Sequence, residues 1–522
     1  MKRIAIQFIL LLFVSSFAYA QAGYLDKTFG DGGVVLANFL DVKNIAFDTE
    51  ILSDGKILQC GILLDPSVLP FVVRYNKNGH LDSSFGSNGV TWYYPKWRLL
   101  ANKIYTYKDG RILIVGVQNS DIYDNRAPYI IRMLPDGKID STFGVNGIFQ
   151  ESDNAFGECF VTAKIQDDGK IRVLGGSGKS NSGYRPTITL ITQNGVRDPS
   201  FGKDGRRLIG SVADTGYVTD AVLDKNNNCL FALGLPSNSA SDVRALRCNK
   251  DGVLDSNYGE KGIVNIPLSD QEDVMTSICI LPNGKTICLV NSYVNNKYQH
   301  SLLRLTSSGK LDPSFGDYGT AGMADVINHS YFSRCNIDSN GNIIISGDRD
   351  GHPADEASSI TARYLPNGML DSSYGVSGGA IKLPIRTTKL YSIDIQSDGK
   401  YLFCGYAGQS NPEWNALLYR VNNTGASDVR RDITRPGKSQ LSLHPTPATD
   451  NCTITFTLPT SSDCSLTLRD ESGRAVKTFI TNEFRAAGKH EDELDLRGLA
   501  AGVYFLSLEH DGKTETAKLI KQ

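Results

Sequence analysis

Apolar and polar residues alternate along most of the chain in short stretches that end at Asp-Gly or Asn-Gly and resume at once. This pattern is typical of antiparallel hairpins with tight turns. In residues 44–86 it predicts four strands: NIAFDTEILS, KILQCGIL, FVVRYN and HLDSSFG, with tight turns at Asp54-Gly55 and Asn78-Gly79. Apolar residues at helical spacing are nearly absent, which indicates an all-β protein.

The same pattern recurs with a period of about 57 residues. One phrase of the form LDxSFGxxG and a second phrase, such as SDGKILQCG, each occur seven times and alternate along the chain. In the first phrase an aspartate, an aromatic residue and a glycine keep a fixed spacing. These repeat-motif residues are Asp26, Phe29, Gly30, Asp82, Phe85, Gly86, Asp140, Phe143, Gly144, Asp198, Phe201, Gly202, Asp255, Tyr258, Gly259, Asp312, Phe315, Gly316, Asp371, Tyr374 and Gly375.

Four antiparallel strands cannot bury both faces of their own sheet, so successive units must stack around an axis. The predicted fold is therefore a seven-bladed β-propeller over residues 23–425. We assign structural roles to the repeat motif. The aromatic side chain packs between neighbouring sheets, the glycine adopts positive φ, and the aspartate binds backbone N–H groups of a turn. Seven equivalent acids around a ring are not expected to be catalytic.

The order of the phrases predicts how the ring closes. The first phrase appears at residues 25–30 before any complete unit, and the last unit has ASDVRRD in its place. The seventh blade therefore has only three strands of its own. We predict that residues 25–30 supply the outer strand, which closes the ring and covers an exposed edge.

Both ends of the chain differ from the repeats. Lys2 and Arg3 precede an apolar run and the small-x-small sequence AYA, which is typical of a cleavable signal peptide over residues 1–20. No later apolar segment approaches the roughly 20 residues that span a bilayer, so a soluble mature protein is expected. After a polar linker at residues 426–439, alternating short stretches in residues 440–522 predict a small β-sandwich.

Composition narrows the classes of partner and cofactor. The chain has 54 basic and 56 acidic residues, a formal net charge of −2, which argues against a nucleic-acid partner bound through a basic face. The ten cysteines and seven histidines show no zinc-site spacing, and no metal or cofactor is expected. Cysteines such as Cys60 and Cys404 are expected to be small buried strand residues.

One cysteine pair is left open by the sequence. Cys279 and Cys288 flank the hairpin LPNGK and can pair across a two-residue loop. A type I turn with a bulge at Gly284 instead places them on opposite faces of the sheet.

Two resemblances follow from these motifs. With its DGKILQCG-like and LDxSFGxxG-like phrases, the region from residue 23 to residue 425 resembles the delta-60 repeat family, which implies a propeller fold and an extracytoplasmic setting without a settled activity. Residues 440–522 resemble the C-terminal sorting domain of the type IX secretion system, through PTPA at 445–448, the turn at 470–473, LAAGVY at 499–504 and the Lys-rich end. Thr446 stands where that family usually has Asn. This resemblance implies export by the type IX machinery of a Gram-negative bacterium to its surface or medium.

Candidate binding residues come from the loops that join the second to the third strand of each unit and one unit to the next. These loops are long and varied and share one face of a propeller, the long-loop face, where function tends to reside. Their aromatic residues can form platforms for sugars or a protein partner, or can fill gaps between blades. The candidate ligand-binding residues are Trp92, Tyr93, Trp97, Tyr123, Tyr184, Tyr298, Asp350 and Trp414.

Catalytic motifs are weak, and no catalytic residue is assigned. GGSGKS at 175–180 has Val173 where the first glycine of a phosphate loop belongs. The densest polar cluster, Asp348, Asp350, Asp355 and Glu356 with Arg349 and His352, can place two carboxylates for hydrolysis or bind a cation, but a solvated loop is the favoured explanation. We therefore predict a non-catalytic carbohydrate- or protein-binding propeller, with a propeller glycan hydrolase or lyase acting at the long-loop face, or a purely structural surface protein, as alternatives.

Overall fold

The computed structural model describes residues 22–37, 42–64, 68–93, 98–118, 127–151, 158–179, 183–211, 216–234, 242–268, 273–294, 297–322, 330–349, 359–375, 388–408, 414–423, 441–458, 462–470, 474–485, 488–510 and 513–522. The chain divides into two compact units, Met1–Ser427 and Asp428–Gln522. The regular secondary structure of the described residues is all β, which confirms the predicted class.

The described residues of the first unit form seven antiparallel sheets. The first sheet contains β2 (Asn44–Ile51), β3 (Ile57–Leu63), β4 (Leu69–Tyr75) and β5 (Val90–Trp92), the second contains β6 (Leu99–Thr106), β7 (Ile112–Gln118), β8 (Pro128–Met133) and β9 (Ile148–Gln150), and the third contains β10 (Glu158–Ile165), β11 (Ile171–Lys179), β12 (Gly183–Ile191) and β13 (Arg206–Leu208). The fourth sheet contains β14 (Tyr217–Leu223), β15 (Cys229–Gly234), β16 (Asp242–Cys248) and β17 (Ile263–Pro267), and the fifth contains β18 (Asp273–Ile280), β19 (Thr286–Val294), β20 (Lys297–Leu305) and β21 (Thr320–Ala321). The sixth sheet contains β22 (Ser330–Ile337), β23 (Ile343–Arg349) and β24 (Ser359–Tyr364), and the seventh contains β25 (Thr388–Ile395), β26 (Tyr401–Ala407), β27 (Asn415–Val421) and β1 (Val34–Ala37).

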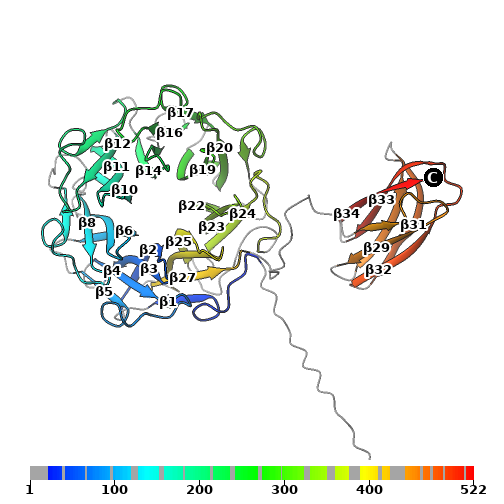
Figure 1. Ribbon diagram of the computed structural model, residues 1–522, viewed down its shortest axis with the longest axis horizontal. Coiled ribbons are helices and arrows are strands. Elements are labelled where there is room, and N and C mark those ends of the chain that lie inside the picture. The colour runs from blue at the N-terminus through cyan, green and yellow to red at the C-terminus, as the bar shows by residue number, and fades with distance from the viewer. Residues whose placement is uncertain are drawn as a thin grey trace, which may run out of the picture. The chain divides into compact units, whose positions relative to one another are not determined.

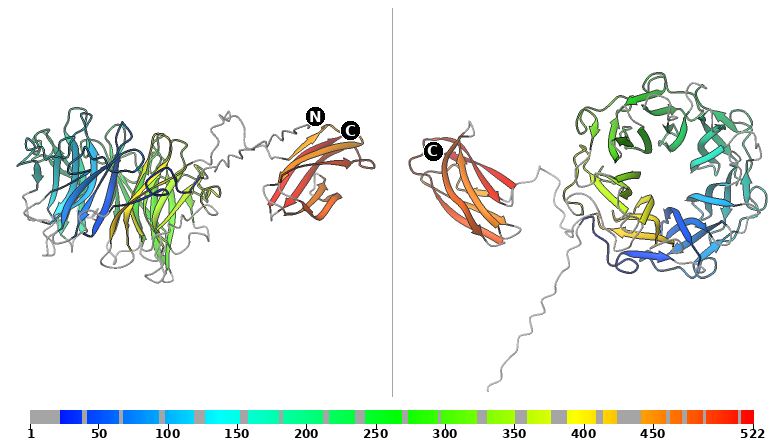
Figure 2. Two further views of the ribbon diagram at one scale, coloured as in Figure 1. Left: turned by 90° about the horizontal axis from the view of Figure 1, so that it is seen from below. Right: turned by 180° about the vertical axis from the view of Figure 1, so that it is seen from behind.

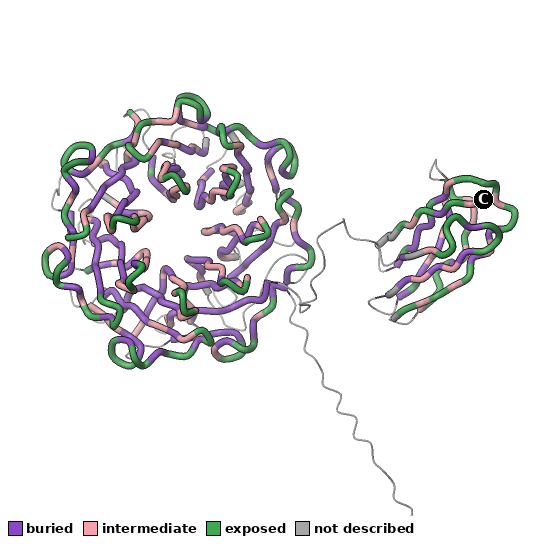
Figure 3. The backbone as a smooth tube through the Cα atoms, viewed as in Figure 1, coloured by how far each residue is buried: buried purple, intermediate pink, exposed green. Residues whose placement is uncertain are grey.

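These sheets stand radially around a common axis (Figure 1). The first strand of each sheet lies at the centre, and the strands run roughly along the axis when the ring is seen from the side (Figure 2). Buried residues follow the strands, while exposed residues gather at the turns, both on the outer rim and nearer the axis (Figure 3). Because each sheet packs its faces against its neighbours, the cores lie between sheets.

The position of the outermost strand differs from the prediction. The phrase LDSSFG was predicted to be the fourth strand of its unit, but that strand is β5, which begins only at Val90. The phrase itself is a compact turn. The amide and hydroxyl of Ser84 donate to Asp82 Oδ1, and Gly86 adopts a φ of 53°. A Cβ at Gly86 would lie 2.3 Å from the Val90 carbonyl oxygen, so only glycine fits here.

The N-terminal segment completes the seventh sheet, but with other residues than predicted. The added strand is β1, which pairs antiparallel with β27 from Val34↔Tyr419 to Ala37↔Ala416. Residues 25–30 form the motif turn just before it, and only Leu25 bridges to Val421. The Asp26 amide also donates to the Arg420 carbonyl at 2.9 Å. Ring closure therefore uses both the motif turn and the strand that follows it.

An arginine in the third strand of most sheets fixes each sheet to the next. Its Nε donates to the motif aspartate, its side chain lies over the motif aromatic ring at 4.3 to 5.1 Å, and its Nη1 donates to a carbonyl in the next sheet. We call this arrangement the arginine clamp. The Nε–Oδ2 distances are 2.8 Å for Arg74–Asp82, 2.7 Å for Arg132–Asp140, 2.9 Å for Arg247–Asp255, 2.7 Å for Arg304–Asp312, 2.7 Å for Arg363–Asp371 and 2.8 Å for Arg420–Asp26.

The clamp also closes the ring. Arg420 of β27 pairs with Asp26 from the N-terminal segment, and its Nη1 donates to the Lys77 carbonyl of the first sheet at 2.7 Å. Burial opposes ionisation of Asp26, but hydrogen bonds from Thr28 and contacts with Lys400 and Arg420 outweigh it and lower the pKa of Asp26 to about 2. Asp26 is therefore charged at neutral pH. The N-terminal segment makes the same contacts as an internal repeat does.

The second unit forms two antiparallel sheets. One contains β28 (Ser442–His444), β29 (Asn451–Leu458) and β32 (Gly488–Asp495), and the other contains β31 (Ala475–Arg485), β30 (Ser462–Arg469), β33 (Gly502–His510) and β34 (Lys513–Lys521). Side chains from both sheets share one core, which includes Ile454, Phe456, Leu466 and Leu506.

Candidate functional site

Aromatic side chains gather at the long-loop end of the fifth, sixth and seventh sheets. Tyr293 lies next to the end of β19, and Tyr298 and Tyr331 lie next to the starts of β20 and β22. Tyr391, Tyr406 and Trp414 lie at the same end of the seventh sheet. We call these six residues, together with Phe47 of β2, the aromatic arc. All are exposed or half-buried, whereas the motif aromatics are fully or almost fully buried.

Ring contacts link the members of the arc within two groups. In the first, Tyr298 lies 4.9 Å from Tyr293 and 5.1 Å from Tyr331, measured between ring centroids. In the second, Tyr406 lies 6.2 Å from Tyr391 and 5.2 Å from Trp414. Phe47 of the first sheet adds a contact with Tyr391 at 5.0 Å. Each ring is thus held by a neighbour, as a preorganised binding platform requires.

A carboxyl and an ammonium group lie between the two aromatic groups. Asp348 is the register partner of Tyr331, and Lys389 is the register partner of Tyr406. Lys389 Nζ lies 3.9 Å from Asp348 Oδ2 and 5.8 Å from the centre of the Tyr391 ring. Burial raises the pKa of Asp348 to about 6, although Lys389 and the Leu390 amide oppose the shift.

The other carboxyl oxygen of Asp348 lacks a hydrogen-bond donor within the described part of the chain. Asp348 Oδ1 is buried and has no hydrogen-bond partner among the residues that the structure describes. An acceptor left without a donor is costly, so a ligand hydroxyl that donates to it is favoured.

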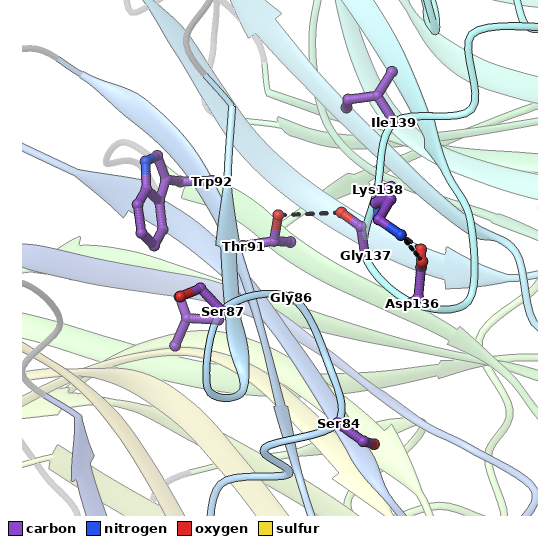
Figure 4. Close-up of a pocket in the computed structure, with 10 residues that line it drawn as sticks. Ser84, Gly86, Ser87, Thr91, Trp92, Asp136, Gly137, Lys138 and Ile139 are labelled. Carbon is purple, nitrogen blue, oxygen red and sulfur yellow. Dashed lines mark hydrogen bonds and ion pairs between the residues drawn. The ribbon is translucent and has the colours of Figure 1, made fainter.

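A pocket lies between the first and second sheets. It measures about 530 Å³ and is lined by the motif turn at residues 84–92 and the turn at residues 136–139 (Figure 4). Trp92 lies on the opposite side of this rim pocket from Lys138, which pairs with Asp136 at 2.8 Å. Thr91 Oγ1 donates to the Gly137 carbonyl at 3.1 Å and joins the two sheets. The rim pocket is separate from the aromatic arc.

The structure does not bring the predicted binding residues together. Tyr298 and Trp414 belong to the aromatic arc, Trp92 lines the rim pocket, and half-buried Tyr93 packs against the core between the first two sheets. Tyr184 is described only as part of β12. Trp97, Tyr123 and Asp350 lie outside the described residues, as do His352, Asp355 and Glu356.

Five arc residues were not predicted from the sequence, namely Phe47, Tyr293, Tyr331, Tyr391 and Tyr406. They lie within strands rather than in the loops that connect them, so loop composition gave no signal. Tyr391 is the extra residue of a β-bulge, because the register shifts between Leu390 and Ser392. A bulge re-aims side chains locally, and the alternation of the sequence cannot predict it.

The first strand of each of the seven sheets in the first unit contains such a bulge. The residue just after the bulge is polar in each strand and lines a cavity of about 260 Å³ on the ring axis, which we call the axial cavity. These seven residues are Asp48, Lys103, Thr162, Asp220, Ser277, Arg334 and Ser392. Contacts among them join neighbouring sheets; for example, Asp48 Oδ1 lies 3.0 Å from Lys103 Nζ and 2.8 Å from Ser392 Oγ.

Two further carboxyls in the axial cavity hold protons unusually tightly. Burial, with the charge of Asp48 as a smaller cause, raises the pKa of Glu50 to about 7. Burial and the charges of Asp48 and Glu50 raise the pKa of Asp394 to about 7 as well. Among the described residues no group of three or more His, Cys, Asp or Glu side chains is placed to hold a metal ion.

We expect the double variant Glu50→Gln/Asp394→Asn to be stabilised more at pH 8 than at pH 5. Both acids have a folded-state pKa above the unfolded one, so their contribution to stability is present below about pH 4 and is lost as the pH rises through about 7. The double variant has no carboxyls to ionise and so avoids that loss. Its melting temperature at pH 8 should therefore lie about 3 °C above that of the wild type. Calorimetry at both pH values measures the effect, with Asp54→Asn on an exposed turn as control. Equal shifts at the two pH values would contradict the burial argument.

Comparisons with known families agree with the two units. Residues 442–522 match the secretion system C-terminal sorting domain, and residues 52–85, 108–143, 166–201 and 281–315 match a domain of unknown function (DUF5122) described as a beta-propeller. The chain therefore combines a β-propeller repeat region with a type IX sorting domain. That sorting domain indicates export to the cell surface or medium and interaction with the secretion machinery. No helix in the described part of the chain is long and apolar enough to cross a membrane.

Similar solved structures have diverse functions. The polysaccharide lyase Uly1 is 11% identical with a TM-score of 0.42, covering 76% of this chain and 93% of its own. A glycoside hydrolase is 12% identical with a TM-score of 0.29, covering 75% and 91%. Drosophila plexin A in complex with semaphorin 1b is 9% identical with a TM-score of 0.30, covering 80% and 84%. A comparison with curated proteins found no match. These likenesses do not distinguish binding from catalysis.

Proposed function

We propose that this chain is an exported, non-catalytic carbohydrate-binding protein whose aromatic arc holds the glycan. The proposed organisation is a signal peptide at residues 1–20, a seven-bladed propeller at 23–425, a linker at 426–439 and a sandwich-type sorting domain at 440–522. In this proposal the type IX machinery of a Gram-negative cell delivers the propeller to the outer surface or the medium.

The observation that carries the proposal is the set of part-exposed rings beside one buried, unpaired acceptor. Aromatic faces cover the apolar C–H faces of sugar rings, and the Tyr and Trp polar groups remain free to bind hydroxyls. Asp348 Oδ1 offers an acceptor and Lys389 offers donors within the same arc. Aromatic surface with a few convergent polar groups is what a small-molecule site needs, and the acceptor favours a hydroxyl-rich ligand.

We expect Trp414→Ala and Tyr406→Ala each to weaken glycan binding at least tenfold. Truncating a central aromatic anchor typically costs about 2 kcal/mol or more of binding free energy. Immobilised neutral and uronic-acid polysaccharides are the probes, and biolayer interferometry gives Kd. Trp92→Ala, in the rim pocket, is the matched control and is expected to bind like wild type.

Two outcomes would contradict this assignment. If Trp92→Ala loses glycan binding while Trp414→Ala and Tyr406→Ala keep it, the binding site is the rim pocket and not the aromatic arc. Absence of binding to every polysaccharide would favour a protein ligand or a purely structural role.

A glycan hydrolase or lyase remains the second candidate because of the axial cavity. Glu50 and Asp394, each with a pKa of about 7, are suited to general acid catalysis at neutral pH. The assay is release of reducing ends, or of unsaturated products absorbing in the ultraviolet, from the same polysaccharides. Activity that Glu50→Gln abolishes would replace the binding proposal with this one.

A further inference from the structure

We propose that Cys279 and Cys335 form a disulfide bond that joins the fifth and sixth sheets beside the axial cavity. Cys279 lies in β18 and Cys335 in β22, the inner strands of these neighbouring sheets. Their Sγ atoms are 3.0 Å apart, and Cys279 Sγ is also 3.0 Å from the Cys335 carbonyl oxygen. Ordinary non-bonded heavy-atom contacts are about 3.5–4.0 Å, so the two sulfurs are closer than packing alone requires.

The backbone around the pair is already fixed in place. The Cys335 amide donates to Ser277 Oγ at 3.3 Å, and Ser277 Oγ lies 2.9 Å from Asp220 Oδ2. The strands that carry the two cysteines are thus held by hydrogen bonds between sheets. A disulfide has an S–S distance of about 2.05 Å, so the sulfurs need to move by only about 1 Å.

Other cysteine pairs are less suited to this linkage. Cys288 faces Ile278 across β18 and β19, whereas Cys279 faces Ile287, so Cys279 and Cys288 lie on opposite faces of the sheet. Cys229 and Cys248 are direct partners of β15 and β16 within one sheet. A bond between those two would add no connection between sheets.

The chemistry is a thiol–disulfide exchange with a disulfide-carrying oxidase of the cell envelope. Two S–H bonds break, one S–S bond forms, and two protons and two electrons pass to the oxidase disulfide, which becomes a dithiol. Export places the chain in a compartment where such oxidants act. The hydrogen bond with Cys335 and burial raise the pKa of the Cys279 thiol well above its usual range. Little thiolate therefore exists after folding, and the exchange is expected while the sheets are still assembling.

Peptide mapping of the full chain tests the bond directly. The protein is recovered from the periplasm of an expression host, denatured without reductant, alkylated with N-ethylmaleimide and digested. We expect alkylation of all but two of the ten cysteines and one linked peptide pair that contains Cys279 and Cys335. Alkylation of both residues in most molecules, or a Cys288–Cys335 link instead, would overturn the proposal.

The response of thermal stability to reductant gives an independent readout. A bond closing a loop of this length is expected to raise the melting temperature by about 5 °C, so dithiothreitol should lower it by that amount in wild type. The variant Cys279→Ser/Cys335→Ser should not respond to dithiothreitol. The matched variant Cys229→Ser/Cys248→Ser should keep the wild-type response. A reductant response that survives in Cys279→Ser/Cys335→Ser would contradict the assignment even if all variants fold.

Discussion

A chain that begins at residue 37 is expected to unfold at much lower denaturant than a chain that begins at residue 21. The deletion removes most of β1, buried Phe29 and the carboxylate of Asp26, and it leaves Arg420 buried without its partner. Burying one large apolar side chain contributes about 1.5–3 kcal/mol, and breaking a buried ion pair costs about 3–5 kcal/mol. The free energy of unfolding should therefore fall by on the order of 5 kcal/mol or more.

Urea unfolding followed by tryptophan fluorescence measures this loss, because all three tryptophans belong to the first unit. The chain beginning at residue 21 is the control, since it lacks only residues 1–20. An unchanged unfolding midpoint in the shorter chain would show that the ring does not depend on its N-terminal segment. A broader transition would indicate that the first and seventh sheets unfold separately once the connection is lost.

Arg132→Met is expected to destabilise the protein by about 3–5 kcal/mol, because it leaves Asp140 buried without its closest cationic partner. The Arg132 and Asp140 side chains are 3% and 6% exposed, and Nε lies 2.7 Å from Oδ2. Burial opposes ionisation of Asp140, but hydrogen bonds from Thr142 and the contact with Arg132 still lower its pKa. The carboxylate is thus charged and loses its main partner.

The third sheet supplies a natural control. It has Leu190 where the other sheets have the arginine, and Asp198 pairs instead with Lys170, whose side chain is 36% exposed. Lys170→Met should therefore cost less than Arg132→Met, since Lys170 is partly exposed and the buried Asp198 keeps its hydrogen bonds from Ser200. A double-mutant cycle with Arg132→Met and Asp140→Asn, followed by urea unfolding, isolates the pairwise term. Equal effects of Arg132→Met and Lys170→Met would contradict the clamp as an energetic link between sheets.

The repeat made the hairpins and the radial stacking of sheets predictable. Asp-Gly and Asn-Gly dipeptides mark tight turns by local chemistry alone, and a fixed period implies a repeating unit. The outer strand was misplaced because LDSSFG alternates apolar and polar residues like a strand. What makes it a turn is the hydrogen bonding of Ser84 to Asp82 and the positive φ of Gly86, which alternation does not show.

The candidate site was much less predictable than the fold. Trp414 and Tyr298 stood out by residue type and loop position, but their partners Tyr406 and Tyr331 come from other strands. Contacts between sheets depend on which side chains the radial stacking brings together, and a pattern within one repeat does not contain that information. The bulges that aim Phe47 and Tyr391 are equally hidden, because a bulge is a property of two paired strands.

Amide hydrogen exchange of residues 22–37 tests the closed ring most directly. The Gly23 amide donates to the Asn422 carbonyl at 2.8 Å, the Asp26 amide donates to Arg420, and β1 pairs with β27 along its length. If the N-terminal segment completes the seventh sheet, these amides should be protected nearly as strongly as those of β26 at the centre of that sheet. Exchange of residues 22–37 at the rate of an unstructured peptide, with β26 still protected, would show that the ring is open at this seam.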